Sequence, residues 1–271
     1  MVEVIAELGI NHNGDINLAR KLIDVAYSAG CHYVKFQKRT VDLVYTKEEL
    51  DKPRESPWGT TTREQKYGLE FDEEYWAIDA YCESRIPWFA SPWYIESVHF
   101  LAQWNIPFIK VPSALITNRE ILEACRETNH KIILSTGMST LKQVDEAIEI
   151  LGQEHIYCVM HCTSTYPTVP EEINAKCILN LKERYPWFKI GFSNHYPGLM
   201  AMLLAVAYGA DVIECHITLD RTMYGSDQAA SIEPQGLFAL MQRINLIERM
   251  KGDGIKQIYD SEVPIIAKLR R

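Results

Sequence analysis

Short apolar segments alternate with longer segments of helical period along most of the chain. Runs such as EVIAEL and DVIECH suit buried strands, whereas the segments between them repeat apolar residues every three or four positions. In the first of these, Leu18 and Leu22 share one helical face, and Asp15 and Gly30 suit its two ends. The predicted strands cover residues 3–8, 33–37, 87–91, 107–111, 131–135, 156–161, 188–193 and 211–216.

A strand followed by a helix, repeated in this way, predicts an α/β fold, the (β/α)8 TIM barrel, whose usual size is about 250 residues. The chain has 271 residues, so we expect a single TIM-barrel domain over 1–271. Residues 38–72 form an unusually long βα loop, which we expect to act as a lid, to contact substrate or to be a mere insertion. Residues 255–271 form a short, polar C-terminal tail.

The composition narrows the class of partner. A formal net charge of −8 and a pI near 5.5 argue against binding to nucleic acid or to acidic membranes. The seven cysteines contain no CxxC pair, which indicates reduced thiols and a cytoplasmic protein. The N-terminus does not resemble a signal peptide, and no apolar run suits a membrane span.

Polar side chains gather where the predicted strands end, which is the end of a TIM barrel that carries catalytic groups. We interpret them as a functional ring rather than as capping residues. The ring contains Glu7, Lys35, Gln37, Ser91, Lys110, Ser113, Ser135, Thr136, His161, Thr163, Ser193, His195, Glu214 and His216.

Lys110 stands out because it interrupts the apolar run IPFIKVPSALIT. A buried lysine without a partner is costly. Together with Lys35 and several hydroxyl groups, it suits a small ligand that carries phosphate and carboxylate. The alternative is that each lysine pairs with a neighbouring carboxylate of the chain.

His195 and His216 end two strands that are neighbours in a barrel, so both imidazoles can reach one ion. Two protein ligands leave open positions, which favours Mn²⁺, Mg²⁺ or a similar Lewis acid over structural zinc. Cys162 and Cys215 adjoin ring residues, but nothing nearby marks them as nucleophiles, and we expect them to be packed in the core.

Eight stretches together resemble the sialic acid synthase (N-acetylneuraminate synthase) family, and they span about residue 3 to about residue 235. They are AELGINHNG (6–14), VKFQ (34–37), ASPW (90–93), KVPS (110–113), ILSTGMS (133–139), HCTSTYPT (161–168), GFSNH (191–195) and ECH (214–216), followed by Asp227 in YGSD.

The resemblance implies a transferase that condenses phosphoenolpyruvate with an N-acetylated hexosamine such as N-acetylmannosamine. The product is a nine-carbon 2-keto-3-deoxy acid, and phosphate is released. His195 and His216 would hold Mn²⁺, with Mg²⁺ or Co²⁺ as alternatives; Glu7, Tyr166 and Asp227 would contact the sugar. The phosphoenolpyruvate ligands would be Lys35, Gln37, Ser91, Lys110, Ser113, Ser135, Ser164 and Ser193.

The chain departs from the family pattern at three places. Ser164 stands where asparagine is common, and Leu115 stands where a proton-transferring carboxylate is usual. We therefore expect Glu7, Lys110 and Glu214 to be the catalytic residues, with a metal-bound water as a further candidate for proton transfer. We also expect the barrel alone, without the family's C-terminal antifreeze-like domain, and leave open whether it forms the family's homodimer.

Two other functions compete with the synthase. A Schiff-base aldolase would use Lys110 or Lys35 as a nucleophile on a keto acid and would need no metal. The second is a barrel that binds phosphoenolpyruvate or a sugar without turnover. In that case Leu115, in place of the carboxylate, would be the trace of a lost catalytic activity. The histidine pair and the hydroxyl ring favour the synthase.

Overall fold

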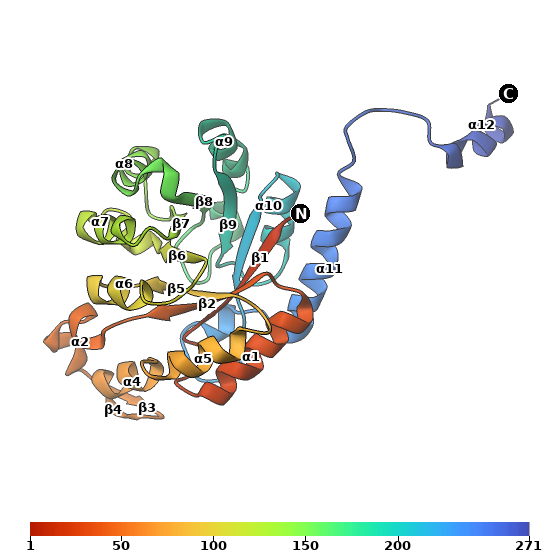
Figure 1. The fold of residues 1–271 in the computed structure, drawn as a ribbon. Helices are drawn as coiled ribbons and strands as arrows, with labels where there is room; N and C mark the ends of the chain where they lie inside the picture. The colour runs from red at the N-terminus through yellow and green to blue at the C-terminus, as the bar shows by residue number, and fades with distance from the viewer. Residues whose placement is uncertain (271) are drawn as a thin grey trace.

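A closed, all-parallel barrel forms the centre of the molecule in the computed structural model, which describes residues 1–270 (Figure 1). Its strands follow one another around the barrel in chain order, and each pairs with two neighbours. The predicted TIM barrel is confirmed. The strands are β1 (Glu3–Gly9), β2 (Tyr33–Lys38), β5 (Trp88–Pro92), β6 (Phe108–Val111), β7 (Lys131–Ser135), β8 (Ile156–His161), β9 (Lys189–Asn194) and β10 (Val212–His216).

A helix follows each barrel strand and covers its outer face (Figure 1). Apolar residues of the helices and of the outward strand positions form one continuous core. These helices are α1 (Ile16–Ala29), α5 (Glu74–Cys82), α6 (Ile95–Leu101), α7 (Arg119–Glu127), α8 (Leu141–Leu151), α9 (Cys177–Arg184), α10 (Met200–Ala207) and α11 (Pro234–Met250).

The ends of α1 are those predicted from the sequence. The Asp15 side chain accepts a hydrogen bond from the Asn17 amide (2.7 Å), and Gly30 ends the helix in the left-handed conformation (φ 84°). The buried face includes Leu22 but is centred on Ala19 and Ile23, since Leu18 is only half-buried.

The segment 38–72 is structured rather than an open loop. It contains α2 (Val41–Val44), α3 (Lys47–Leu50), β3 (Pro53–Ser56), β4 (Gly59–Thr61) and α4 (Thr62–Leu69), with β3 and β4 forming a separate antiparallel hairpin (Figure 1).

This insertion is packed against the turn that follows β1. The Phe71 and His12 rings are stacked with centroids 3.9 Å apart. Gly14 has φ 67°, and a Cβ atom there would lie 2.0 Å from the Gly68 carbonyl oxygen. Only glycine permits so close an approach of the two backbones, so the insertion is fixed beside the first βα turn.

Beyond α11 the chain leaves the barrel and ends in α12 (Val263–Leu269), which projects away from it (Figure 1). Six large apolar side chains of this tail are more than half exposed. They are Ile255, Ile258, Tyr259, Val263, Ile265 and Leu269.

Two further expectations concern covalent state and membranes. All seven cysteines are free, as predicted. Among residues 1–270, no helix is both long enough and apolar enough to cross a membrane.

The burial of His12 makes the stability of the fold depend on pH. Burial lowers the pKa of His12 from 6.5 to about 3, so between these values the unfolded chain binds the proton more readily. The stabilisation is therefore complete above pH 6.5 and decreases as the pH falls towards 3.

We expect the free energy of unfolding in urea to fall by about 1 kcal/mol more, between about pH 7.5 and about pH 5.5, in the wild type than in His12→Gln. Other buried histidines titrate in both proteins, so the difference isolates His12. Equal losses in the two proteins would contradict the assignment.

Candidate active site

A cavity of about 250 Å³ lies at the carboxyl ends of the barrel strands. All of the catalytic, substrate-binding and metal-binding residues that the family resemblance predicts line it except Asp227, which lies beside one of them. The predicted residues in its wall are Glu7, Lys35, Gln37, Ser91, Lys110, Ser113, Ser135, Ser164, Tyr166, Ser193, His195, Glu214 and His216.

Four buried charges form the floor of this cavity. Lys35 pairs with Glu7, and Lys110 pairs with Glu214. Lys35 Nζ is also 3.8 Å from Glu214 Oε1, which joins the two pairs, and none of the four side chains is more than 5% exposed. The lysines therefore have carboxylate partners within the chain, the alternative that the sequence left open.

The pairing decides the charge state of the cluster. Burial alone would lower the pKa of Lys110, but the attraction of Glu214, with help from Glu7, leaves that pKa raised. Burial alone would raise the pKa of Glu214, but Lys110 and Lys35 hold it below its ordinary value. At neutral pH the Lys110–Glu214 pair is an ammonium and a carboxylate.

Other contacts complete the floor. Glu7 Oε1 accepts a hydrogen bond from Gln37 Nε2 (2.8 Å), and the side-chain oxygen Oε1 of Gln37 accepts one from Arg39. Because a guanidinium only donates, Arg39 fixes the Gln37 amide with its NH₂ group towards Glu7. Arg39 in turn pairs with Glu70 of the insertion (3.2 Å), so the insertion supports the site indirectly.

Hydroxyl groups line the wall above the lysines. Ser113 Oγ accepts a hydrogen bond from the Gly137 amide (3.0 Å) and lies 3.2 Å from Cys162 Sγ. A Cβ atom at Gly137 would lie 2.2 Å from Ser164 Oγ, so any larger residue there would displace the Ser164 hydroxyl. Among the described residues, the buried Ser135 Oγ has no hydrogen-bond partner and is available to a ligand.

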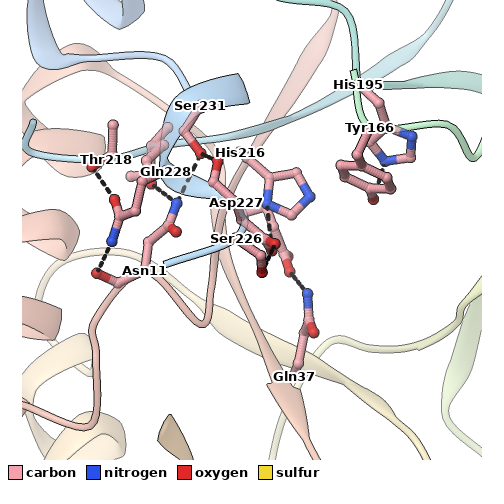
Figure 2. Close-up of polar contacts among 12 residues, drawn as sticks. Asn11, Gln37, Tyr166, His195, His216, Thr218, Ser226, Asp227, Gln228 and Ser231 are labelled. Atoms are coloured by element: carbon pink, nitrogen blue, oxygen red, sulfur yellow. Dashed lines mark hydrogen bonds and ion pairs between the residues drawn. The ribbon is translucent and has the colours of Figure 1, made fainter. Parts of the chain in front are cut away.

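The two histidines lie side by side with ring centroids 5.9 Å apart (Figure 2). His195 Nδ1 donates to the Thr163 carbonyl oxygen (2.6 Å), which leaves Nε2 as an acceptor for the Tyr166 hydroxyl (2.5 Å). Burial, followed by the proximity of His216, lowers the pKa of His195 to about 3. This ring is therefore neutral, the form that binds a metal ion.

His216 also has a nitrogen to offer. Its Nδ1 lies 3.7 Å from Asp227 Oδ2 and makes no hydrogen bond with any described residue (Figure 2). Within residues 1–270, no group of three or more His, Cys, Asp and Glu side chains is arranged to hold a metal ion. Nδ1 of His216 and Nε2 of His195, which accepts from Tyr166, are the nitrogens of this pair that would hold an ion at an open site.

Some ring residues do not face the cavity. Thr136 Oγ1 donates to the Met160 carbonyl oxygen (2.9 Å), and His161 Nε2 contacts the Ile173 carbonyl oxygen (2.8 Å). Both line a neighbouring cavity of about 410 Å³ that has no charged carboxylate or ammonium in its wall. His161 lines this second cavity and not the first, so its ring lies away from the charged floor.

The sequence interpretation also missed residues. Cys162 lines the cavity and is not merely packed in the core. Trp93, Ala114 and Met138 lie in the wall as well, each within three residues of a predicted ligand. Leu115, in contrast, does not line the cavity and packs against the core.

A closed (β/α)8 barrel with a charged cavity at the carboxyl ends of its strands defines a TIM-barrel enzyme. Residues 22–256 match the model of the NeuB family. The chain is 36% identical to N-acetylneuraminate-9-phosphate synthase of Homo sapiens over 98% of its length and 76% of that protein.

The chain is also 37% identical to N,N'-diacetyllegionaminic acid synthase of Campylobacter jejuni, over 99% of its length and 83% of that protein. A crystal structure of N-acetylneuraminic acid (sialic acid) synthetase from Leptospira borgpetersenii, in complex with citrate, superposes with a TM-score of 0.85. It has 30% identity and covers 100% of this chain and 93% of that chain. The chain belongs to the NeuB family, which confirms the resemblance seen in the sequence and the prediction of an enzyme.

The Lys110–Glu214 pair yields a stability prediction. Glu214→Gln keeps the shape of the side chain but leaves Lys110 buried without its counter-charge. We expect the free energy of unfolding in urea to fall by about 3 kcal/mol.

The double variant Lys110→Met/Glu214→Gln removes both charges and should recover most of that loss. A single variant as stable as the wild type, within about 1 kcal/mol, would show that the pair does not matter for folding.

Proposed function

We propose that the protein condenses phosphoenolpyruvate with an N-acetylated hexosamine resembling N-acetylmannosamine. The product is a nine-carbon 2-keto-3-deoxy sugar acid, and the reaction depends on a divalent metal ion. One observation carries the proposal: a single cavity holds two lysines, a wall of hydroxyl groups and two adjacent imidazoles.

The lysines and hydroxyls suit phosphoenolpyruvate. An ammonium has three donors, and the contacts of Lys110 Nζ among the described residues are with Glu214 alone, which leaves donors for a ligand. Ser113, Ser135 and the half-buried Ser164 add directional hydrogen bonds near it.

Charge balance supports a role for a cation. The floor is neutral overall, since Glu7 and Glu214 offset Lys35 and Lys110. A ligand with both phosphate and carboxylate therefore brings uncompensated negative charge into a buried site. A divalent ion on His195 and His216 would offset part of it and would polarise the aldehyde oxygen of the open-chain sugar.

The chain's own groups then position the reactants. Lys35 and Lys110 hold the phosphoenolpyruvate oxygens while its C3 forms a bond with the sugar's aldehyde carbon. The aldehyde oxygen takes up a proton and becomes a hydroxyl group. Water adds to the resulting cationic C2 and loses one proton, and the C2–O bond to phosphate breaks as the C2 hydroxyl loses the second proton and the carbonyl forms. Glu7 and Glu214 are the carboxylates in the described cavity wall, so they are the groups that can accept the proton from water.

The acceptor would lie towards the open side of the cavity. Tyr166 is 51% exposed and contacts His195, and Asp227 lies next to His216. The two relatives carry the names of different sugar acids, which supports an amino sugar as the class of acceptor without selecting one.

The raised pKa of Lys110 disfavours the Schiff-base aldolase, because imine formation requires a neutral amine. Treatment with borohydride and pyruvate should leave no covalent adduct. An adduct on Lys110 or Lys35 would instead favour the aldolase.

We expect release of phosphate from phosphoenolpyruvate only when Mn²⁺ and an acceptor sugar are both present, and loss of release with a chelator. The acceptor panel begins with N-acetylmannosamine and its 6-phosphate, and mass spectrometry identifies the sugar acid. Binding of phosphoenolpyruvate without release for any acceptor would favour a non-catalytic barrel.

A charge-balanced variant tests the phosphoenolpyruvate half. Lys110→Met/Glu214→Gln should lose at least about 100-fold in phosphoenolpyruvate affinity by calorimetry, since a charged hydrogen bond to the ligand is lost. Lys189→Met is the control, because Lys189 pairs with Glu3 (2.6 Å) at the opposite end of the strands. If the double variant kept its affinity for phosphoenolpyruvate, Lys110 would not be a ligand of phosphoenolpyruvate.

A further inference from the structure

The segment between β10 and α11, residues 217–233, brings Asp227 to the site. Its carboxylate lies 3.7 Å from His216 Nδ1, although Asp227 does not itself line the cavity. The segment has little regular structure apart from one short 3₁₀ turn at Gln228–Ala230. Its position therefore depends on contacts with the rest of the barrel.

A buried polar network supplies these contacts, and Asn11 lies at its centre (Figure 2). Asn11 Nδ2 donates to the Ile217 carbonyl oxygen (2.8 Å) and to Ser231 Oγ (2.8 Å). The Ser231 hydroxyl then donates to the backbone carbonyl of Asp227 (2.7 Å). One side chain of the first βα turn is thus connected, through Ser231, to the backbone of Asp227.

Gln228 closes the network from the other side. Its Nε2 donates to the Asn11 carbonyl oxygen (3.2 Å) and to that of Tyr224 (3.3 Å), and its Oε1 accepts from the Thr218 hydroxyl. Asn11, Gln228, Thr218 and Ser231 are each at most 4% exposed. Their hydrogen bonds form away from water, where losing one partner is costly.

We propose that Asn11 is a positioning residue for the acceptor side of the site. It holds the Asp227 carboxylate beside His216 through Ser231, and does so without touching the cavity. This inference rests on the proposed function, because it assigns Asp227 to the acceptor sugar.

The side chain required at this position is an amide. Both hydrogens of Nδ2 are used, one on a carbonyl and one on a hydroxyl, and the hydroxyl is thereby left to donate to Asp227. Aspartate has the same shape but no hydrogen to donate at neutral pH. It would repel the Ile217 carbonyl and would redirect the Ser231 hydroxyl to itself.

The test compares Asn11→Asp with Asn13→Asp. Asn13 makes the same kind of contact two residues away, from Nδ2 to the Tyr224 carbonyl oxygen (2.9 Å), but has no bond to Ser231 or Asp227. We expect Asn11→Asp to raise the KM for the acceptor by about 10-fold or more and to leave the KM for phosphoenolpyruvate within about twofold. Asn13→Asp should change neither by more than about twofold.

Hydrogen exchange of the free protein gives a readout that needs no substrate. Amides of residues 226–232 should exchange about 10-fold faster in Asn11→Asp than in the wild type, with strands β5 to β7 unchanged. Asn13→Asp should match the wild type over the same residues.

A purely structural role predicts a different pattern. Partial unfolding would lower kcat because a smaller fraction of the enzyme is active. It would leave both KM values unchanged and speed exchange throughout the barrel, and that result would overturn the proposal.

If the wild type shows no turnover with any acceptor, the proposed function fails, and the exchange comparison still decides whether Asn11 holds the segment. Equal exchange at 226–232 in both variants would show that it does not.

Discussion

Two ion pairs at the floor of the barrel, Lys35 with Glu7 and Lys110 with Glu214, determine what the rest of the site can be. They lie where inward side chains of β1, β2, β6 and β10 converge, and they are almost fully buried. An unpaired lysine there would lose its proton or unfold the barrel. The two glutamates allow both lysines to stay charged in the folded barrel before any ligand binds. Because each lysine is paired, the floor of the cavity has no net positive charge.

Much of the fold follows from local pattern. All the barrel strands were predicted within one or two residues, because a buried parallel strand is a short apolar run and the helices between strands repeat at helical period. The grouping of the polar strand ends could also be predicted, because in a closed parallel barrel the carboxyl ends of all strands lie at the same end. Glu7, Lys110 and His216 lie far apart in the sequence and share one cavity.

The sequence could not predict which side chains contact each other across the barrel. Lys110 and Glu214 are separated by 104 positions, and only the closed barrel decides that they pair rather than await a ligand. The outward turn of His161 depends on the register of β8, which a run of apolar residues on both faces does not reveal. The packing of segment 38–72 depends on a stack between His12 and Phe71, and nothing local to either residue marks it.

The neutral floor also links the two halves of the proposed reaction. An anionic ligand that enters a cavity without net charge gains from a nearby cation, and the cation gains from the ligand by the same factor, because coupling between binding sites is reciprocal. Neither half of the site is then complete alone. The hydrophobic Leu115 lies outside the cavity, so the carboxylates that neutralise the floor are also those left to move protons. In the proposed reaction, a lysine–glutamate pair that serves folding in the empty barrel would also constrain catalysis in the occupied one. In the proposed reaction, any change to Glu7 or Glu214 would alter both the charge of the floor that meets the ligand and the proton acceptor that acts on it.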